Sequence, residues 1–186
     1  MEIALSILIG IGLAAACGFR VFVPFLVVSI ASMSGHLELA EGFEWLGTHP
    51  ALWAFAVAAL LEILAYYIPW LDNLLDTIAT PAAVAAGIVI TASVIDDVSP
   101  FLKWTLAVIA GGGTAAAVQA GTVAVRGTST VTTGGIANPV VSTGDLGGSA
   151  LVATLAVVLP VVAIALVIIM SAFLVKLRRW SRRSAS

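Results

Sequence analysis

Residues 66–81, YYIPWLDNLLDTIATP, place carboxylates, an amide and hydroxyls between two apolar runs of the chain. Asp72 and Asp76 are four residues apart, so a helix would put both carboxylates on one face. Asn73 and Thr77 would lie beside them. Oxygen ligands of these types suit a hard cation or a polar head group. The alternative is a solvated acidic face on a helix at the membrane interface, and the spacing agrees with both.

Two single charges lie inside apolar runs. Glu62 stands within ALLEILAYY, and Arg20 is the only lysine or arginine among the first hundred residues. An ionised side chain in a membrane segment is costly unless it faces the bundle interior, water or a partner. Glu62 and Arg20 are therefore candidates to line a substrate path. The alternatives are a structural ion pair between them, or a Glu62 side chain that reaches the interface.

Residues 127–148, GTSTVTTGGIANPVVSTGDLGG, are rich in hydroxyls and glycine and carry one charge, Asp145. We expect a polar loop that binds an anion or lines a pore through backbone groups, or else a flexible outer loop of the same composition. The candidate residues in and next to this loop are Arg126, Thr132, Thr133 and Asn138.

Composition excludes several classes of protein. The 186 residues are 61% hydrophobic and only 10% charged, whereas soluble domains carry roughly a quarter charged residues. We therefore expect an integral membrane protein in contact with the lipid bilayer. No folded basic face is present for nucleic acid. His36 and His49 lack further ligands for a metal, and no nucleophile elbow, Walker loop, HExxH or dinucleotide fingerprint occurs. We expect no enzyme, no cofactor and no metal site.

The apolar runs predict an all-α, polytopic membrane helix bundle of about five spans with broken or re-entrant segments. The runs are residues 3–33, 50–68, 81–95, 101–125 and 151–175, and Pro50, Pro81 and Pro100 are predicted to begin helices. The first run would be about 46 Å long as one helix, against a hydrocarbon core of roughly 30 Å. A break near Arg20, between Gly18 and Pro24, would give a discontinuous helix or a re-entrant pair of half-helices.

The ends of the chain carry its topology signal. Pro160 should kink the last run, and residues 1–178 form one bundle followed by a basic tail at 179–186. The last eleven positions hold five of the eight lysines and arginines, so the positive-inside rule puts the C-terminus in the cytoplasm of an inner-membrane protein. Counting back puts loop 34–49 and the Asp96-Asp97 turn inside, and residues 66–81 and 127–148 outside. The N-terminus lies outside if residues 3–33 cross once, and inside if they re-enter.

Small residues recur at helical spacing in two runs. Gly10, Ala14 and Gly18 form one ridge, and a second ridge consists of Gly113, Ala117 and Gly121. Such ridges let helices approach closely, either within the bundle or between copies of the chain. We therefore expect a homo-oligomer to be able to form through these helix faces.

Three segments carry a resemblance that covers nearly the whole chain: GLAAACGFRVFVPFL, ExxAYYIPWLDNLLDTIATP and TSTVTTGGIANPVVS. Together they resemble the bacterial integral-membrane family catalogued as domain of unknown function 4126. The resemblance implies a small multi-spanning inner-membrane protein and brings no catalytic residue with it.

Broken helices, rare internal charges and the lack of enzyme motifs favour a transporter or channel-like protein for a small solute, an ion or a lipid head group. The alternative is a non-catalytic membrane scaffold or accessory subunit, which would use the small-residue ridges as partner surfaces. A membrane enzyme acting through Asp72 and Asp76 is the third hypothesis, and nothing in the sequence fixes a substrate geometry for it.

Overall fold

The computed structural model describes residues 3–169 and 172, and for residues 69, 70, 72–74 and 76 it describes the backbone alone. These residues are all-helical, as predicted, and contain no strand. The elements are α1 (Ile3–Cys17), α2 (Phe22–Met33), η1 (Glu44–Gly47), α3 (His49–Ala65), α4 (Pro69–Ala92), α5 (Pro100–Leu106), η2 (Ala107–Gly112), α6 (Gly113–Thr133) and α7 (Asn138–Val158). A further helical segment, Pro160–Ile169, follows α7.

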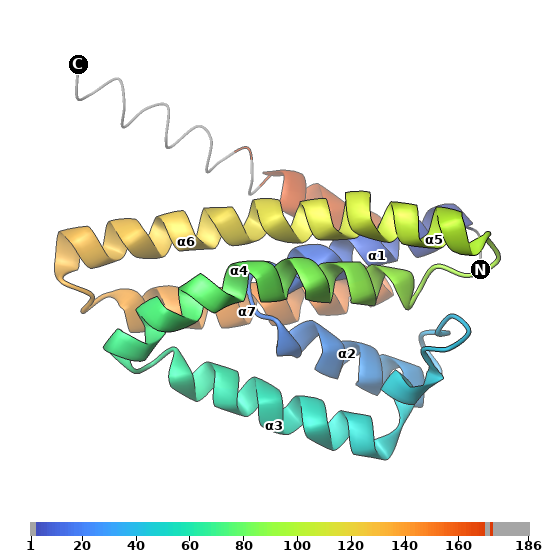
Figure 1. Ribbon diagram of the computed structural model, residues 1–186, viewed down its shortest axis with the longest axis horizontal. Helices are drawn as coiled ribbons and strands as arrows, with labels where there is room; N and C mark the ends of the chain where they lie inside the picture. The colour runs from blue at the N-terminus through green and yellow to red at the C-terminus, as the bar shows by residue number, and fades with distance from the viewer. Residues whose placement is uncertain (1–2, 170–171, 173–186) are drawn as a thin grey trace.

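The first apolar run forms two helices, α1 and α2, and the chain reverses direction between them. Ser6 of α1 and Ser32 of α2 line one cavity, so the outer ends of both helices lie at the same end of the bundle (Figure 1). The chain turns back at residues 18–21, and Pro24 falls in the first turn of α2, where a missing N–H costs nothing. The break predicted near Arg20 is therefore confirmed.

α1 is the central helix of the bundle and packs against α7, α4 and α6. Its residues Leu13, Ala14, Ala15, Ala16 and Cys17 have no exposed surface. At Gly10 an added Cβ would lie 2.9 Å from the Thr91 side chain, and at Gly18 it would lie 2.6 Å from that of Val118. The ridge predicted from Gly10, Ala14 and Gly18 therefore does bring helices together, and it does so within the bundle.

Two predicted helix starts are confirmed and one is wrong. The Thr48 side chain accepts the Ala51 N–H ahead of Pro50, and the Ser99 side chain accepts the Leu102 N–H ahead of Pro100. Pro81 does not begin a helix, because it lies inside α4, which starts at Pro69. A proline removes one hydrogen bond from a helix interior, and the flanking turns keep α4 continuous although it bends part-way (Figure 1).

The prediction of a polar loop at residues 127–148 is wrong, because only residues 134–137 separate α6 from α7. The hydroxyl groups whose abundance predicted a loop donate hydrogen bonds to carbonyls of their own helix. Thr128 donates to Ala124 O at 2.8 Å and Thr132 to Thr128 O at 2.8 Å. The turn itself is made by Gly134 and Gly135, whose φ angles of 64° and 86° are readily adopted by glycine.

α5, η2 and α6 form one continuous helix, Pro100–Thr133, that contains a π-helical stretch. This helix and α7 are each long and apolar enough to cross a membrane. α7 ends at Val158, and Leu159 has φ −140° and ψ 67° before the helix resumes at Pro160. The kink predicted from Pro160 is confirmed. The basic tail at 179–186 lies outside the described residues.

Candidate functional site

Two buried arginines meet one tyrosine ring in the interior of the bundle. The guanidinium carbons of Arg20 and Arg126 lie 4.1 Å and 4.2 Å from the centre of the Tyr66 ring. Arg20 is in the turn between α1 and α2, Tyr66 ends α3, and Arg126 is in α6. Their exposed fractions are 1%, 4% and 2%. Cation–π contacts between desolvated groups each contribute on the order of 2 kcal/mol. Three distant parts of the sequence thus converge in one cluster.

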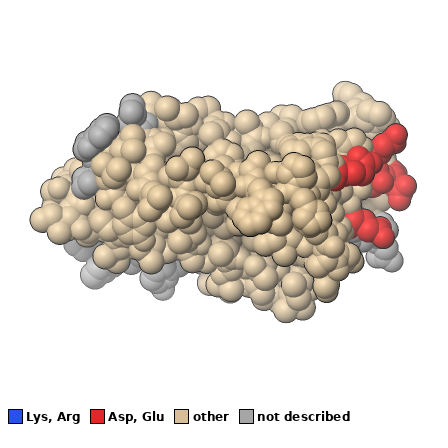
Figure 2. Space-filling view, turned by 90° about the horizontal axis from the view of Figure 1, so that it is seen from below, with Lys and Arg blue, Asp and Glu red and all other residues tan. Residues whose placement is uncertain are grey.

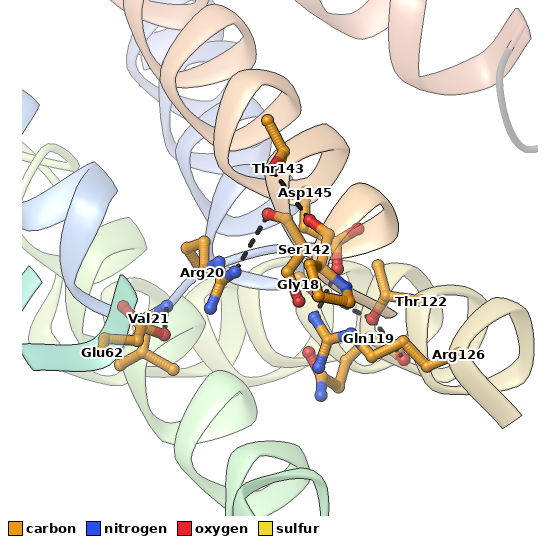
Figure 3. Close-up of polar contacts among 11 residues, drawn as sticks. Gly18, Arg20, Val21, Glu62, Gln119, Thr122, Arg126, Ser142, Thr143 and Asp145 are labelled. Carbon is orange, nitrogen blue, oxygen red and sulfur yellow. Dashed lines mark hydrogen bonds and ion pairs between the residues drawn. The ribbon is translucent and has the colours of Figure 1, made fainter. Parts of the chain in front are cut away.

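Arg126 forms an ion pair with Asp145 that joins α6 to α7 (Figure 3). The side chains of Arg126 and Asp145 are 2% and 10% exposed. Because the α6–α7 turn is tight, residues at equal distances on either side of it lie opposite one another. Arg126 therefore has a carboxylate partner within the bundle.

Arg20 has different partners. Its Nη2 donates to the Ser142 carbonyl of α7 at 3.0 Å (Figure 3). The buried Nε and Nη1 atoms of Arg20 have no hydrogen-bond partner among the described residues, and neither does the buried Ser142 hydroxyl. No ion pair joins Arg20 to a carboxylate in the part of the chain that the structure describes. Arg20 is thus a buried cation with unused donors.

Glu62 holds the start of α2. Its Oε1 accepts the Val21 N–H at 2.8 Å and its Oε2 accepts the Phe22 N–H at 3.1 Å. These N–H groups belong to a helix N-terminus, where a carboxylate is stabilised by the helix dipole. The direct Arg20–Glu62 ion pair considered from the sequence is not formed among the described side chains. Glu62 instead fixes the turn that carries Arg20.

Hydroxyls from α6 and α7 support the end of α1. Ser149 donates to Ala16 O at 3.0 Å, and Thr122 lies 3.5 Å from Gly18 O. Ala16 O also accepts the backbone N–H groups of Phe19 and Arg20, at 3.1 Å and 3.2 Å. Backbone and side-chain donors thus both reach the end of α1 at the break.

The model of one protein family, described as Domain of unknown function (DUF4126), matches residues 7–180. The chain belongs to this family. The match confirms the resemblance seen in the sequence and shows that the whole cluster lies within the family domain. No curated protein and no solved structure matches the chain.

Within this DUF4126 domain the structure brings together only part of the predicted site. Arg20, Glu62 and Arg126 come together. Thr132 and Thr133 are exposed, and their hydroxyls donate to their own helix. Asn138 is buried and bonds Thr130 through its side chain at 3.0 Å. Thr77 is exposed on α4. The side chains of Asp72, Asn73 and Asp76 lie outside the described residues.

Sequence reasoning missed Tyr66, Ser142 and the partner role of Asp145. Tyr66 lies four residues after Glu62 and therefore on the same helix face. That spacing was the available signal. Ser142 takes part through its backbone carbonyl, which accepts from Arg20. Every residue has such a carbonyl, so the residue type does not predict the contact.

The chemistry of the cluster is that of hydrogen-bond donation by cations. The described residues hold no group of three or more His, Cys, Asp or Glu side chains that could bind a metal ion. Guanidinium groups do not give up their protons in proteins, so neither arginine is a general base. What the cluster offers is positive charge, planar donors and an aromatic face in a dry interior.

Proposed function

We propose that this chain is a multi-spanning membrane transporter or channel-like protein, and that a small solute, ion or lipid head group passes the Arg20–Tyr66–Arg126 cluster. The observation that carries the proposal is Arg20, a buried cation with unused donors at the break between α1 and α2. Ionisable groups inside membrane bundles mark substrate paths, and transporters bind substrates where helices are interrupted.

The outer surface supports membrane insertion. Large apolar side chains are exposed along α3, including Trp53, Val57, Leu60, Leu61 and Leu64. On the face shown in Figure 2, all visible Asp and Glu atoms lie at one end of the molecule, and no Lys or Arg atom is visible. A flank without charged side chains is the pattern expected of a protein surrounded by lipid. The inner membrane and a cytoplasmic C-terminus follow from the positive-inside rule as part of the proposal.

Described carboxylates gather at one end of the bundle. At this end, a cavity of about 390 Å³ is lined by carboxylates of the α2–η1 loop, η1 and the α4–α5 turn, namely Glu38, Glu44, Asp96 and Asp97. Arg126 and Asp145 lie seven residues from the ends of the α6–α7 turn, about 10 Å at 1.5 Å per residue. The α6–α7 end carries hydroxyls instead of described carboxylates. We place the entrance to the arginine cluster there.

Solute flux into reconstituted vesicles tests the proposal. Vesicles with wild-type protein are mixed with hyperosmotic glycerol, urea, potassium acetate or potassium chloride, and stopped-flow light scattering reports shrinkage and re-swelling. Valinomycin carries the potassium counter-ion. A fluorescent-phospholipid translocation assay covers lipid head groups. We expect at least one solute to cross faster than in protein-free vesicles.

Two variants give the flux experiment its specificity. Arg20→Gln should return the rate to that of protein-free vesicles. Lys103→Gln also removes one cation, but from the carboxylate end, where Lys103 pairs with Asp96 at 3.7 Å, and it should keep the wild-type rate. Protein-free rates for every solute and lipid, or equal rates for wild type and Arg20→Gln, would refute the proposal.

A membrane scaffold or accessory subunit is the second candidate, and one observation favours it. The second small-residue ridge faces outward: Gly113 and Ala117 are exposed, and a Cβ added at Gly113 would meet nothing within 4 Å. Gly113→Leu should then change the mass of the detergent-solubilised complex measured by light scattering, while Arg20→Gln leaves that mass unchanged. An unchanged mass for Gly113→Leu would remove the support for this candidate.

A further inference from the structure

We propose that Arg20 binds an oxyanion, the carboxylate or phosphate group of a small solute or of a lipid head group, through its Nε and Nη1 donors. The inference deepens the proposed function and rests on it for the path that leads to the site. It names the chemical class of the ligand, which the flux proposal leaves open.

Unused donors are the first reason. Arg20 is 1% exposed, yet Nε and Nη1 have no acceptor among the described residues. Buried polar groups in native proteins nearly always have a partner, and an exception calls for a bound water or ion. The Ser142 hydroxyl is likewise buried without a partner, and it belongs to the residue whose carbonyl Arg20 contacts. Two sets of unsatisfied groups therefore occur in adjoining residues.

Charge balance is the second reason. The Arg126 charge is compensated by Asp145 in an ion pair. Both oxygens of Glu62 accept backbone N–H groups of α2. Glu62 lies near enough for its charge to act on Arg20, but it makes no ion pair with Arg20, whose direct described contacts are a carbonyl oxygen and an aromatic face. An anion on Arg20 would supply the compensation that a buried cation needs.

The geometry of the group selects the class of anion. A guanidinium is a planar array of N–H donors that matches the oxygens of carboxylate and phosphate, and its bonds to them are charge-assisted. A cationic solute would face two guanidinium groups around Tyr66, and a neutral solute would give Arg20 no directly bound negative charge. We therefore expect acetate-like or phosphate-like groups to bind and ammonium or sugar groups not to bind.

One exposed polar contact lies next to the site residues in the sequence. Tyr67 and Thr143 directly follow the site residues Tyr66 and Ser142, and their hydroxyls lie 2.8 Å apart at the surface. This contact joins the end of α3 to α7.

Ligand-dependent thermal unfolding tests the inference. The purified full chain in detergent is heated with sodium acetate, sodium phosphate or glycerol 3-phosphate, and sodium chloride at equal ionic strength is the reference. Tryptophan fluorescence reports unfolding. We expect a saturable rise in Tm with at least one oxyanion for wild type and Lys103→Gln, and no rise for Arg20→Gln.

A second variant covers the case in which Arg20→Gln does not fold. Arg20→Lys keeps the charge but replaces the planar donor array by a point charge, and we expect at least tenfold weaker binding. Native mass spectrometry distinguishes the lipid source: a phospholipid retained by wild type after delipidation and lost from Arg20→Lys identifies a head group. The inference is overturned if wild type binds no oxyanion and retains no lipid, or if Arg20→Lys binds as tightly as wild type.

The outcomes separate this inference from the proposed function. Binding that depends on Arg20 without any flux would preserve the oxyanion site and refute transport. Flux of glycerol or urea that is lost in Arg20→Gln, together with no oxyanion binding, would preserve the transport proposal and overturn the oxyanion site.

Discussion

Replacing Glu62 by glutamine should loosen the start of α2. Each carboxylate oxygen of Glu62 accepts one backbone N–H, at 2.8 Å and 3.1 Å. Hydrogen bonds to a charged group contribute about 1.5–3 kcal/mol each, and a neutral one contributes about 1 kcal/mol. Glutamine keeps one acceptor and turns its NH₂ group toward the second N–H. Because the site is only half-buried, the lower part of the range applies, and we expect a loss of about 2–3 kcal/mol.

The free energy of unfolding measures this loss. Tryptophan fluorescence is followed during titration with a denaturing detergent, with Glu41→Gln as the matched control. Glu41 is exposed in the loop before η1, so its substitution should change the unfolding free energy by less than about 0.5 kcal/mol. Equal unfolding free energies for Glu62→Gln and Glu41→Gln would refute the role of Glu62 at the α2 start.

Three further substitutions test packing and pairing, each by unfolding in the same assay. Asp145→Asn leaves the Arg126 charge buried without its carboxylate and should cost about 3–5 kcal/mol; a loss below about 1 kcal/mol would contradict a buried pair. Gly111→Ala puts a Cβ 2.3 Å from a threonine hydroxyl of α4 and should cost at least about 2 kcal/mol, whereas Gly113→Ala has free space and should be neutral or stabilising. Gly134→Ala should cost about 1 kcal/mol because φ is 64° there, and an unchanged Tm would contradict this.

The parts of the fold that could be predicted were those with local signals. Pro50 and Pro100 begin helices because a proline fits a first turn and a preceding hydroxyl caps it. The break near Arg20 followed from length, since 31 apolar residues exceed one membrane crossing. Pro81 carried the same local signal as Pro50 and still lies inside a helix. The residue type alone therefore does not distinguish a proline that begins a helix from one inside it.

The polar segment at 127–148 was misread because composition is ambiguous there. Threonine and serine are common in loops, but in a helix their hydroxyls bond to a carbonyl four residues back, as in Thr128 and Thr132. Once the segment is helical, Arg126 and Asp145 face each other across the turn. The error about secondary structure was thus also the reason why the ion pair was missed.

The convergence on Tyr66 could not have been read from the sequence, because it joins residues 20, 66 and 126 through tertiary packing. Scarcity of charge drew attention to Arg20 and Glu62, and the structure buries Arg20 and bonds Glu62 to backbone N–H groups. The scarcity of charge could not show which groups Arg20 and Glu62 contact. A single cation and a single carboxylate in apolar runs suggest an ion pair with each other. In the structure, Glu62 accepts backbone N–H groups at the start of α2. Arg20 contacts a carbonyl oxygen and an aromatic ring.

That division of roles bears on how an anion would be recognised. In interrupted membrane helices, the N–H groups at a half-helix N-terminus commonly bind the anionic substrate. Here those N–H groups of α2 are already bonded to Glu62. A substrate anion would find its donors on the Arg20 side chain, one residue before Val21. Glu62 would then hold the turn in place while Arg20 selects the ligand, so Glu62→Gln should weaken binding through misplacement of Arg20 and leave the preference among oxyanions unchanged.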